Sequence, residues 1–545
     1  MIGFLKFNKG LKWSLNILHI FLLVFCTLFV VIDLELYRLW NFRLDATPIL
    51  YVTTNAKGAM ALGDNWVIIR QIVIWIATVG SFTYAFLKLV SPQIEKFEKI
   101  HWKFAPLLLI LTASMILPIR GTLGMTPLNA GFVFFHDTNT FANHSALNLI
   151  WNIGKSVSQV NKVKSPPDLL EPEKADELWN ELFVAKNDST IKVLNTNRPN
   201  IILFIVENFT SKFIETLGGK TGVTPNLEKF IDEGILFTHF YGNGDRTERG
   251  IVSVLSACPQ HPTTSIVKFT NKTQHMGFIS AELGKNGYTT SNVSGYDLSY
   301  ANLRAYFSNG GFDKIISAPD YDPSIPVGKW GIDDHYVLDR LLTELDEIQQ
   351  PFFNLCITLS SHHPFTVPME TVIEGDDEDS RFMNAAYYTD KSLGEFIEKA
   401  KTKDWWDNTL VILTADHGNI APRNVFNEPD NGFKIPMIWF GGALAKKDTT
   451  ISTYGSQNDI ANTLMGQLDI KTDAFKFSRN LLATNSKSFA QFSFNNGFGF
   501  VNDSTLLMYD NVSNKYIHEA GASSELEKSM GKAAMQKIYK YLDSL

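Results

Sequence analysis

Long apolar runs occupy the first part of the chain, and short apolar runs separated by polar segments fill the rest. The first long run, Trp13 to Ile32, is almost wholly apolar and follows a tail that carries Lys6, Lys9 and Lys12 without acidic residues. A run of this length predicts a helix that crosses a membrane. No small-residue cleavage pattern precedes Asp33, so we expect a retained anchor rather than a cleaved signal peptide.

Two more apolar runs follow, Ile72 to Val90 and Phe104 to Ile119. The second is long enough to cross a bilayer, and the third is marginal against the roughly 17 to 25 residues that a spanning helix needs. Lys96, Lys99 and Lys103 lie between them, so the positive-inside rule places this segment and the basic N-terminal tail in the cytoplasm. Three crossings would put everything after about residue 120 outside the cell, whereas a buried or interfacial third helix would leave it inside.

A polar connector then leads into a globular part. Residues 161–198 hold the Pro166-Pro167 pair, several charged residues and few that could form a core, so we expect a partly helical connector. From Pro199 onward, strand-like runs alternate with helical patterns such as Asn226 to Glu233 and Ser380 to Lys401. The strand-like runs are Asn200 to Val206, Thr289 to Val293, Phe352 to Leu359, Leu410 to Thr414 and Ile435 to Phe440. This alternation predicts an α/β domain with a mostly parallel central sheet.

These patterns divide the chain into four parts. They are a transmembrane region of about three spans (1–120), a juxtamembrane connector (121–198), an α/β domain (199–520) and a C-terminal helix (521–545). The mean hydropathy of −0.03 over 545 residues then averages an apolar part and a water-exposed part. A large core is within reach of a chain of this length.

Charge and cysteine usage exclude two classes of protein. The formal net charge of −7 argues against a nucleic-acid binder, because phosphate-backbone binding needs a basic excess or a dense basic patch. Cys26, Cys258 and Cys356 are far apart and form no CxxC pair. Neither a disulfide scaffold nor a thiolate metal site is indicated, and we expect buried free thiols.

Polar residues directly follow two of the strand-like runs. Glu207 follows the first run of the α/β domain, and Asp416 and His417 follow the run that ends at Thr414. Ligands bind beyond the carboxyl ends of the strands in a parallel sheet. Carboxylates and an imidazole meeting there would suit one ion such as Mn²⁺, Zn²⁺ or Mg²⁺. The alternatives are a helix cap at Glu207 and a simple turn at Asp416 and His417.

A third element lies between Gly242 and Gly250, ahead of a helical pattern from Ile251 to Ser256. Thr247 would lie near the helix N-terminus, where unpaired backbone N–H groups and the helix dipole favour an anion such as phosphate. A metal bound to its hydroxyl would lower the pKa of that hydroxyl and make Thr247 a nucleophile. The alternative is a threonine that only caps the helix.

Five segments occur in a characteristic order: Pro199–Glu207, Gly222–Leu227, Gly234–Thr238, Gly244–Gly250 and Thr414–Gly418. Together they resemble the lipoteichoic acid synthase and phosphoglycerol transferase group of the sulfatase/alkaline phosphatase superfamily. Asp459-Ile460 and Thr463-Leu464 also fit the superfamily's terminal helix. The resemblance covers roughly residues 199–470 and implies an alkaline phosphatase/sulfatase-like domain preceded by N-terminal membrane helices.

The resemblance also implies the chemistry. A single divalent metal, commonly Mn²⁺, would be held by Glu207, Thr247, Asp416 and His417, with Thr247 as the covalent nucleophile. Thr247 would attack a phosphodiester and form a phosphothreonine intermediate, which an acceptor hydroxyl or water would release. The expected reaction moves phosphoglycerol or another phospho-alcohol from a phospholipid such as phosphatidylglycerol to a glycan or lipid acceptor. The expected location is the cell membrane, multi-pass, with the catalytic domain extracytoplasmic.

Substrate-side residues follow from the same resemblance. His362 matches the family's histidine that contacts the substrate phosphate, and its neighbour His363 is the rival for that role. Asp297 and Arg304 fit the family's substrate-binding segment. A cation such as Arg304 suits a phosphate, and a structural salt bridge is the alternative for it.

The substrate-binding segment also departs from the lipoteichoic acid synthases. Gly295 stands where they carry a histidine, and Asn302 stands where they carry a tryptophan. These two departures bear on the expected substrate, because they lie in the segment that would bind the phosphoglycerol headgroup.

Three rival functions are compatible with parts of the pattern. A phosphodiesterase or phosphatase, or a sulfuric ester hydrolase-like enzyme, would use water as the acceptor. A formylglycine sulfatase needs Cys or Ser in a C/S-x-P-x-R context, and Cys258-Pro259-Gln260-His261 has another order. A non-catalytic membrane scaffold would have lost one of the four expected metal ligands, and all four are present.

Overall fold

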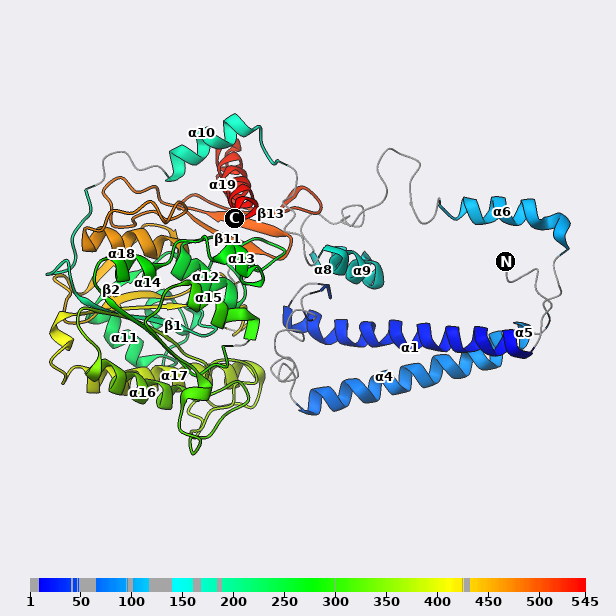
Figure 1. Cartoon of the computed structure of the whole chain (residues 1–545), viewed down its shortest axis with the longest axis horizontal. Coiled ribbons are helices and arrows are strands. Elements are labelled where there is room, and N and C mark those ends of the chain that lie inside the picture. The colour runs from blue at the N-terminus through cyan, green and yellow to red at the C-terminus, as the bar shows by residue number, and fades with distance from the viewer. Residues whose placement is uncertain are drawn as a thin grey trace. The chain divides into compact units, whose positions relative to one another are not determined.

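The computed structural model describes residues 9–40, 43–46, 48, 65–94, 96, 101–116, 140–159, 168–183, 189–298, 300–423, 425 and 432–545. The chain divides into two compact units (Figure 1). We call the described residues between 9 and 159 the helical unit, and residues 168–511 and 516–545 the α/β unit.

Two long helices, α1 and α4, form most of the helical unit. They run antiparallel, because Asn16 Nδ2 donates to Ser91 Oγ at 2.9 Å near one end and Arg70 pairs with Glu35 at 2.5 Å near the other. Both are long and apolar enough to cross a membrane. The elements of the unit are α1 (Lys9–Trp40), α4 (Asn65–Ala85), η2 (Phe86–Val90), α5 (Ser91–Ile94), η3 (Trp102–Phe104), α6 (Ala105–Ser114), α8 (Thr140–Ala146) and α9 (Leu149–Gln159).

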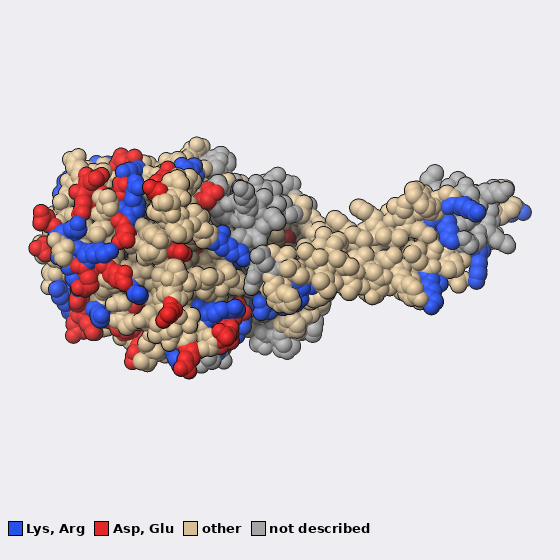
Figure 2. Space-filling view, turned by 90° about the horizontal axis from the view of Figure 1, so that it is seen from below, with Lys and Arg blue, Asp and Glu red and all other residues tan. Residues whose placement is uncertain are grey.

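The outer surface of this helix pair is apolar. Trp13 is 68% exposed and Trp66 is 69% exposed. In Figure 2 this surface is a tan stretch with blue Lys and Arg side chains toward its ends. Lys9 at the start of α1 and Lys88 in η2 lie at the same end of the antiparallel pair. A contiguous apolar surface of this kind is suited to lipid rather than to water.

The third expected span lies only partly within the described residues. Within the run from Phe104 to Ile119, helix α6 covers only 10 residues, and residues 117–119 lie outside the described part. Ten helical residues rise about 15 Å, half of the roughly 30 Å hydrocarbon core. Among the described residues, two helices are therefore long enough to cross a membrane, and the third span stays a prediction.

An eight-stranded sheet forms the centre of the α/β unit, in the order β5-β4-β6-β1-β7-β8-β2-β9. Only β8 runs against its neighbours, which confirms the predicted mostly parallel sheet. The strands are β1 (Asn200–Val206), β2 (Ile235–Phe237), β4 (Thr289–Ser294), β5 (Lys314–Ile316), β6 (Phe352–Ile357), β7 (Thr409–Ala415), β8 (Met437–Phe440) and β9 (Thr449–Ile451). Strands β3 (Phe240–Tyr241) and β10 (Gly455–Ser456) form a separate two-stranded parallel sheet.

Helices cover both faces of this sheet. Figure 1 shows α11, α16 and α17 on one face and α12, α14, α15 and α18 on the other. These helices are α11 (Pro225–Asp232), α12 (Thr247–Ser256), α14 (Ile279–Lys285), α15 (Leu303–Asn309), α16 (Asp334–Glu347), α17 (Glu378–Ala400) and α18 (Ile460–Leu468). Short helices complete the unit: η5 (Ser211–Phe213), η6 (Glu215–Leu217), η7 (Ile266–Lys268), α13 (Thr270–Thr273), η8 (Tyr300–Asn302), η9 (Ala318–Asp320), η10 (Trp406–Asn408) and η11 (Gln457–Asp459).

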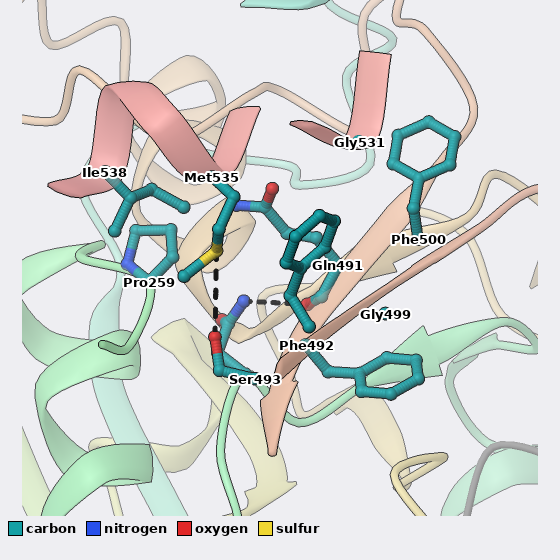
Figure 3. A pocket seen from close by; sticks show the side chains of 11 residues that line it. Pro259, Gln491, Phe492, Ser493, Gly499, Phe500, Gly531, Met535 and Ile538 are labelled. Carbon is teal, nitrogen blue, oxygen red and sulfur yellow. Dashed lines mark hydrogen bonds between the residues drawn. The ribbon is translucent and has the colours of Figure 1, made fainter. Parts of the chain in front are cut away.

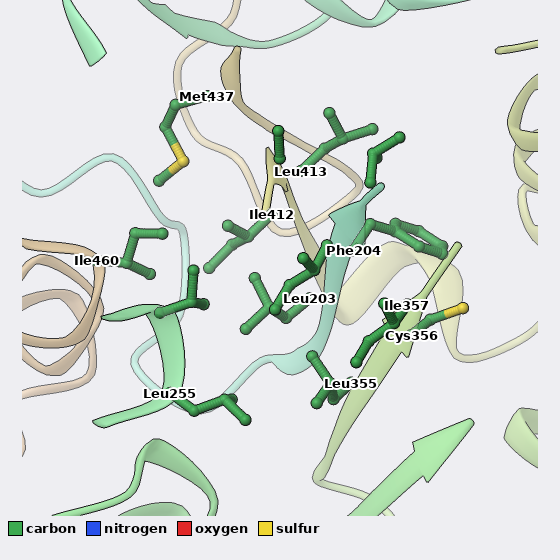
Figure 4. Close-up of a cluster of buried hydrophobic side chains, with 14 of the residues drawn as sticks. Leu203, Phe204, Leu255, Leu355, Cys356, Ile357, Ile412, Leu413, Met437 and Ile460 are labelled. Atoms are coloured by element: carbon green, nitrogen blue, oxygen red, sulfur yellow. The ribbon is translucent and has the colours of Figure 1, made fainter. Parts of the chain in front are cut away.

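The core of the α/β unit is built around β1, whose residues Ile201–Val206 are fully buried. Successive strand side chains point to opposite faces, so a strand covered on both faces is apolar throughout. The ring of Phe204 packs edge-on against Phe396 of α17 at 5.6 Å. Figure 4 shows Leu203 and Phe204 among the side chains of β6 and β7, with Leu255 of α12 and Ile460 of α18 nearby.

The three cysteines form no disulfide. Cys258 and Cys356 are buried free thiols, as predicted, whereas Cys26 on α1 is half-buried. Burial raises the pKa of the Cys258 thiol to about 12. Such a thiol stays protonated at neutral pH and serves as packing.

A second, antiparallel sheet follows the main one in sequence, in the order β11-β12-β13-β14. Its strands are β11 (Ala490–Phe494), β12 (Gly497–Val501), β13 (Thr505–Asp510) and β14 (Lys515–Gly521), followed by α19 (Glu525–Ser544). Helix α10 (Pro172–Phe183) packs on α19, where Ala175 and Leu178 are buried against Ala533. Part of the expected polar connector therefore belongs to the core of the α/β unit.

Candidate metal centre and active site

The metal-binding candidates lie at the carboxyl ends of two adjacent strands. In the register of β1 and β7, Val206 is paired with Ala415, so Glu207 and Asp416 are the next residue on each strand. The ligand atoms of Glu207, Asp416 and His417 all lie within 4.8 Å of one another. The structure thus brings Glu207 together with Asp416 and His417, which follow it by some two hundred residues in sequence.

The polar atoms of this cluster fit a divalent cation. His417 Nε2 lies 3.8 Å from Glu207 Oε1 and 3.6 Å from Asp416 Oδ2. Asp416 Oδ2 is buried and has no hydrogen-bond partner among the residues that the structure describes, which is costly unless a cation lies beside it. His417 Nδ1 donates to the Gly418 carbonyl at 2.9 Å, and this hydrogen bond leaves the Nε2 lone pair for a metal.

The electrostatics of the Glu207 and Asp416 carboxylates also favour a bound cation. Burial raises the pKa of Glu207 well above its ordinary value, and the nearby charge of Asp416 raises it further. Hydrogen bonds from Tyr296 and Thr247 oppose this rise without cancelling it. Two buried carboxylates without a cation repel each other, so a bound cation would offset their desolvation and their mutual repulsion.

Neighbouring backbone and side chains fix the orientation of Asp416. Its Oδ1 accepts hydrogen bonds from the backbone N–H groups of Asn208 and His417, each at 2.7 Å. Gln457 Nε2 donates to the carbonyls of Ala415 and Asp416 at 2.7 and 2.6 Å. Oδ2 is therefore the Asp416 oxygen that is available to bind a metal ion.

Thr247 occupies the first position of α12, and its hydroxyl reaches the same cluster. Thr247 Oγ1 donates to Glu207 Oε2 at 3.1 Å. The N-cap of α12 is Arg246, whose backbone is extended, so the alternative of a threonine that only caps the helix does not apply. The free N–H groups of the first turn make this end of α12 favourable for an anion.

Helix α12 approaches the metal-binding loop more closely than a side chain would allow. A Cβ atom on Gly250 would lie 1.8 Å from the Asp416 carbonyl oxygen. Glycine at this position lets the helix backbone pack directly on the residue that carries the ligand. The approach sets the distance between Thr247 and the three metal-binding candidates.

The C-terminal sheet supports the loop that precedes Thr247, a contribution that the sequence did not reveal. Asn243 Nδ2 donates to the Gln491 carbonyl at 3.0 Å, and Ser493 N donates to the Asn243 carbonyl at 2.9 Å. Figure 3 shows Gln491 and Ser493 beneath Met535 and Ile538 of α19. The hollow that these side chains line is too narrow to admit a water molecule, so it is a packing interface rather than a substrate site.

His362 lies on the loop after β6, beside the metal-binding cluster. Its Nδ1 donates to the His363 carbonyl at 2.9 Å. Burial lowers the pKa of His362 to about 4, and the charge of nearby His417 also lowers it. The ring of the rival His363 contacts Phe365 at 5.2 Å.

The other substrate-side candidates are placed differently. Arg304, on α15, donates to Ser317 Oγ at 2.9 Å and makes no hydrogen bond or ion pair with the metal-binding candidates in the described part of the chain. Asp297, beyond the end of β4, has an exposed side chain. Their assignment to substrate binding stays a prediction.

The two departures from the lipoteichoic acid synthases have structural consequences. A Cβ atom on Gly295 would lie 2.5 Å from the Ile332 carbonyl oxygen, so the backbone of a neighbouring loop occupies the space of a side chain. Asn302 has a left-handed backbone with a φ of 62° and its Nδ2 donates to the Val267 carbonyl at 3.4 Å.

Two residues near the site were not singled out from the sequence. Tyr296 is buried, and its hydroxyl donates to Glu207 Oε2 at 2.6 Å. The ring centroid of Trp330 lies 4.1 Å from that of His362. Tyr296 follows β4 by two residues, so the rule that pointed to Glu207 could have found it, whereas no local pattern marks Trp330.

Comparisons with known proteins give a family and a fold. The profile of the family described as Sulfatase matches residues 199–470. A protein of the alkaline phosphatase superfamily from Vibrio parahaemolyticus is 25% identical, with a TM-score of 0.60 over 69% of this chain and 97% of its own. The lipoteichoic acid synthase LtaP from Listeria monocytogenes is 21% identical, with a TM-score of 0.58 over 69% of this chain and 98% of its own. Both structures support the alkaline phosphatase/sulfatase-like fold.

Curated relatives carry related names. A lipoteichoic acid synthase-like protein of Bacillus subtilis is 24% identical over 315 residues, which are 53% of this chain and 51% of the relative. A lipoteichoic acid synthase of Staphylococcus saprophyticus is 26% identical over 405 residues, which are 65% of this chain and 61% of the relative. The chain therefore spans about half to three fifths of the length of these relatives.

Proposed function

Because residues 199–470 belong to the sulfatase family, we propose that this protein is a membrane-anchored, metal-dependent phosphotransferase. It moves phosphoglycerol or a similar phospho-alcohol from a phospholipid such as phosphatidylglycerol to a glycan or lipid acceptor. The observation that carries the proposal is the position of Thr247, whose hydroxyl lies 3.1 Å from Glu207 Oε2 at the N-terminus of α12.

The covalent step takes place on Thr247. Its Oγ1 attacks the phosphorus of the donor phosphodiester, the bond from phosphorus to the lipid oxygen breaks, and diacylglycerol leaves with a proton. The phosphothreonine that remains lies at the positive end of α12, where the free N–H groups of the first turn stabilise its charge. An acceptor hydroxyl then attacks the phosphorus and releases Thr247.

The metal site supplies the electrostatic part of the reaction. Glu207, Asp416 and His417 would hold the cation, with Thr247 as the fourth ligand, and an O/N donor set of this kind suits Mn²⁺, Zn²⁺ or Mg²⁺. When bound, the cation would lower the pKa of the Thr247 hydroxyl and stabilise the charge that develops on the phosphate. Tyr296 and Asn208 keep Glu207 and Asp416 in place for this role.

His362 serves the second half of the reaction. Its Nδ1 is the donor to the His363 carbonyl, so the neutral ring presents Nε2 as an acceptor. A pKa of about 4, lowered by burial, keeps this ring neutral near pH 7. A neutral Nε2 accepts a hydrogen bond from an acceptor hydroxyl, which favours His362 as the residue that orients the acceptor.

The helical unit supports a membrane location for this chemistry. Helices α1 and α4 are long and apolar enough to cross a bilayer, and a lipid donor is reached most readily by an anchored enzyme. Two crossings return the chain to the side on which it began, so the segment that follows α4 decides whether the α/β unit lies outside the cytoplasm. We propose that a third crossing after residue 101 places it outside.

One experiment tests donor and nucleophile together. The protein is incubated with Mn²⁺ and phosphatidylglycerol labelled in the headgroup, and both diacylglycerol release and label on a tryptic peptide containing Thr247 are measured. The proposal expects both, and it expects transfer to an added glycolipid acceptor to exceed release to water. Label released only to water would favour the hydrolase, and no diacylglycerol from any phospholipid would reject the transferase.

A further inference from the structure

A tight hairpin of residues 327–332 lies across the segment that follows β4. Gly328 N donates to the Gly331 carbonyl at 2.7 Å, and Val327 and Ile332 form an antiparallel bridge at its base. The returning strand pairs with the β4 extension, because Ile332 N donates to the Gly295 carbonyl at 3.0 Å. A bridge between Tyr296 and Gly331 continues this pairing.

Two glycines allow this contact to be made backbone to backbone. A Cβ atom on Gly331 would lie 2.0 Å from the Gly295 carbonyl oxygen, and a Cβ atom on Gly295 would lie 2.5 Å from that of Ile332. The hairpin is therefore held at a fixed distance from residues 295–296. Tyr296, whose backbone pairs with Gly331, donates its hydroxyl hydrogen to Glu207 Oε2 at 2.6 Å.

The tip of the hairpin places Trp330 against the loop that carries His362. The indole Nε1 donates to the His363 carbonyl at 2.6 Å, and the ring centroids of Trp330 and His362 are 4.1 Å apart. The carbonyl that accepts from Trp330 is the same one that accepts from His362 Nδ1. Trp330 thus fixes the ring plane of His362. It also fixes the His363 carbonyl oxygen, whose hydrogen bond with Nδ1 sets the tautomer of His362.

Trp330 is less exposed than Val327 at the base of the hairpin. Val327 is 68% exposed, whereas Trp330 is half-buried although both belong to the same short hairpin. The His362 side chain makes no other hydrogen bond among the described residues, so Trp330 and the His363 carbonyl account for its orientation.

We propose that Trp330 is a positioning residue for the transfer reaction, which holds His362 beside the metal centre with Nδ1 protonated and Nε2 directed to the acceptor hydroxyl. The inference rests on the proposed function, because His362 has this task only if an acceptor is used. Trp330 and Gly331 of the hairpin then form the acceptor-side wall of the site, joined to the metal ligand Glu207 through Tyr296.

The test compares Trp330→Ala, which removes the ring, with Trp330→Phe, which keeps a ring but removes the N–H donor. Val327→Ala, on the same hairpin, is the matched control. Each full-length variant is assayed with phosphatidylglycerol and a glycolipid acceptor, and bound Mn²⁺ and Tm are measured alongside. For Trp330→Ala we expect kcat to fall between about 10-fold and about 100-fold with KM for the donor and Mn²⁺ content unchanged, because misplacing a catalytic group has effects of that size.

The rates of the other two variants complete the comparison. Trp330→Phe should recover part of the loss and Val327→Ala should lose nothing. An equal fall for Val327→Ala, or a loss for Trp330→Ala that follows a fall in Tm or in bound Mn²⁺, would overturn the positioning role and leave Trp330 as packing.

A second readout does not depend on turnover. With ¹⁵N-labelled histidine in the full-length protein, the His362 signal is assigned from its disappearance in His362→Gln. Wild type should show His362 with Nδ1 protonated, and Trp330→Ala should show a mixture of both tautomers. If wild type transfers nothing but this change occurs, the proposed function fails and the positioning stands. An unchanged tautomer in Trp330→Ala would reject the positioning.

Discussion

The helical unit and the α/β unit place their apolar side chains in opposite directions. In α1 and α4 the large apolar residues face outward, and Phe21 of α1 is 61% exposed. In β1 the residues Ile201–Val206 are fully buried, and the polar residue that follows them, Glu207, is buried as well. The helical unit is therefore matched to a lipid environment, and the α/β unit is matched to water with polar chemistry confined to one edge of its sheet.

The same contrast explains where chemistry is possible. An apolar surface in lipid anchors a protein but offers no preorganised dipoles. The sheet edge, by contrast, carries two carboxylates and an imidazole inside a water-excluded site, where electrostatic effects are strong. Each of the following changes should act on one side of this contrast and leave the other intact.

The largest effect is expected for Thr247→Ala. Turnover of phosphatidylglycerol should fall by at least about 10³-fold, because the covalent nucleophile is removed. Bound Mn²⁺ and membrane association should be retained, since Glu207, Asp416 and His417 remain. Thr402→Ala, an exposed threonine after α17, is the control with full activity. Full activity in Thr247→Ala would eliminate the threonine mechanism.

The next prediction replaces one exposed apolar residue by lysine in each of the two units. Val73 on α4 is 60% exposed and Ile191 in the α/β unit is 45% exposed. Val73→Lys should cost about 2.5–3.5 kcal/mol in membrane insertion, because a charge would lie within the bilayer. Ile191→Lys should change the free energy of unfolding by less than about 0.5 kcal/mol. Insertion is measured by carbonate extraction, and equal behaviour of the two variants would break the comparison.

Asp416→Asn should separate metal binding from stability. We expect the affinity for Mn²⁺, measured by isothermal titration, to fall at least about 100-fold, since even residues that only support a ligand have effects of 10- to 100-fold. Without metal, however, the variant should unfold at a higher temperature than wild type, because one of two buried, mutually repelling carboxylates is gone. A lower Tm in the metal-free variant would contradict our account of the site.

Acid should weaken the α/β unit through His261. This side chain is buried against Tyr539 of α19, and burial lowers its pKa from 6.5 to about 3. The unfolded chain therefore takes up a proton below pH 6.5 that the folded chain takes up only near pH 3, so the free energy of unfolding falls as the pH drops through this window. Between pH 7 and pH 5 the loss is about 2 kcal/mol.

Thermal unfolding at the two pH values measures this loss. His261→Gln should show a smaller fall in Tm between pH 7 and pH 5 than wild type. His275→Gln, at an exposed position, should behave as wild type does. An equal pH dependence in wild type and His261→Gln would rule out His261 as the source.

Gly→Ala substitutions should change the free energy of unfolding in opposite directions in the two units. Gly250→Ala in α12 places a Cβ atom 1.8 Å from the Asp416 carbonyl oxygen, so we expect a loss of about 1–3 kcal/mol and of activity. Gly154→Ala in α9 of the helical unit meets nothing within 4 Å and should stabilise its helix by about 0.5–1 kcal/mol. Chemical denaturation in detergent measures both, and destabilisation by both changes would remove the contrast.

Much of the fold and part of the site followed from local patterns. Apolar runs predicted β1, β4, β6 and β7 to within two residues, because a strand covered on both faces needs an unbroken apolar stretch. The third span stays a prediction, because the last residues of that apolar run, 117–119, lie outside the described part. The C-terminal sheet was not predicted because polar residues stand among the apolar ones in its strands and Gly497 and Gly499 interrupt β12.

The sequence by itself determined which side chains follow the strands. Glu207, Asp416 and His417 are candidates because of their position after apolar runs, and the order of the parallel strands then brings them together. Only the tertiary structure decided which residues support them. Tyr296, Trp330 and Gly250 act through contacts with residues far away in the chain, and hydrophobic periodicity records only which face of an element is buried, not what that face meets.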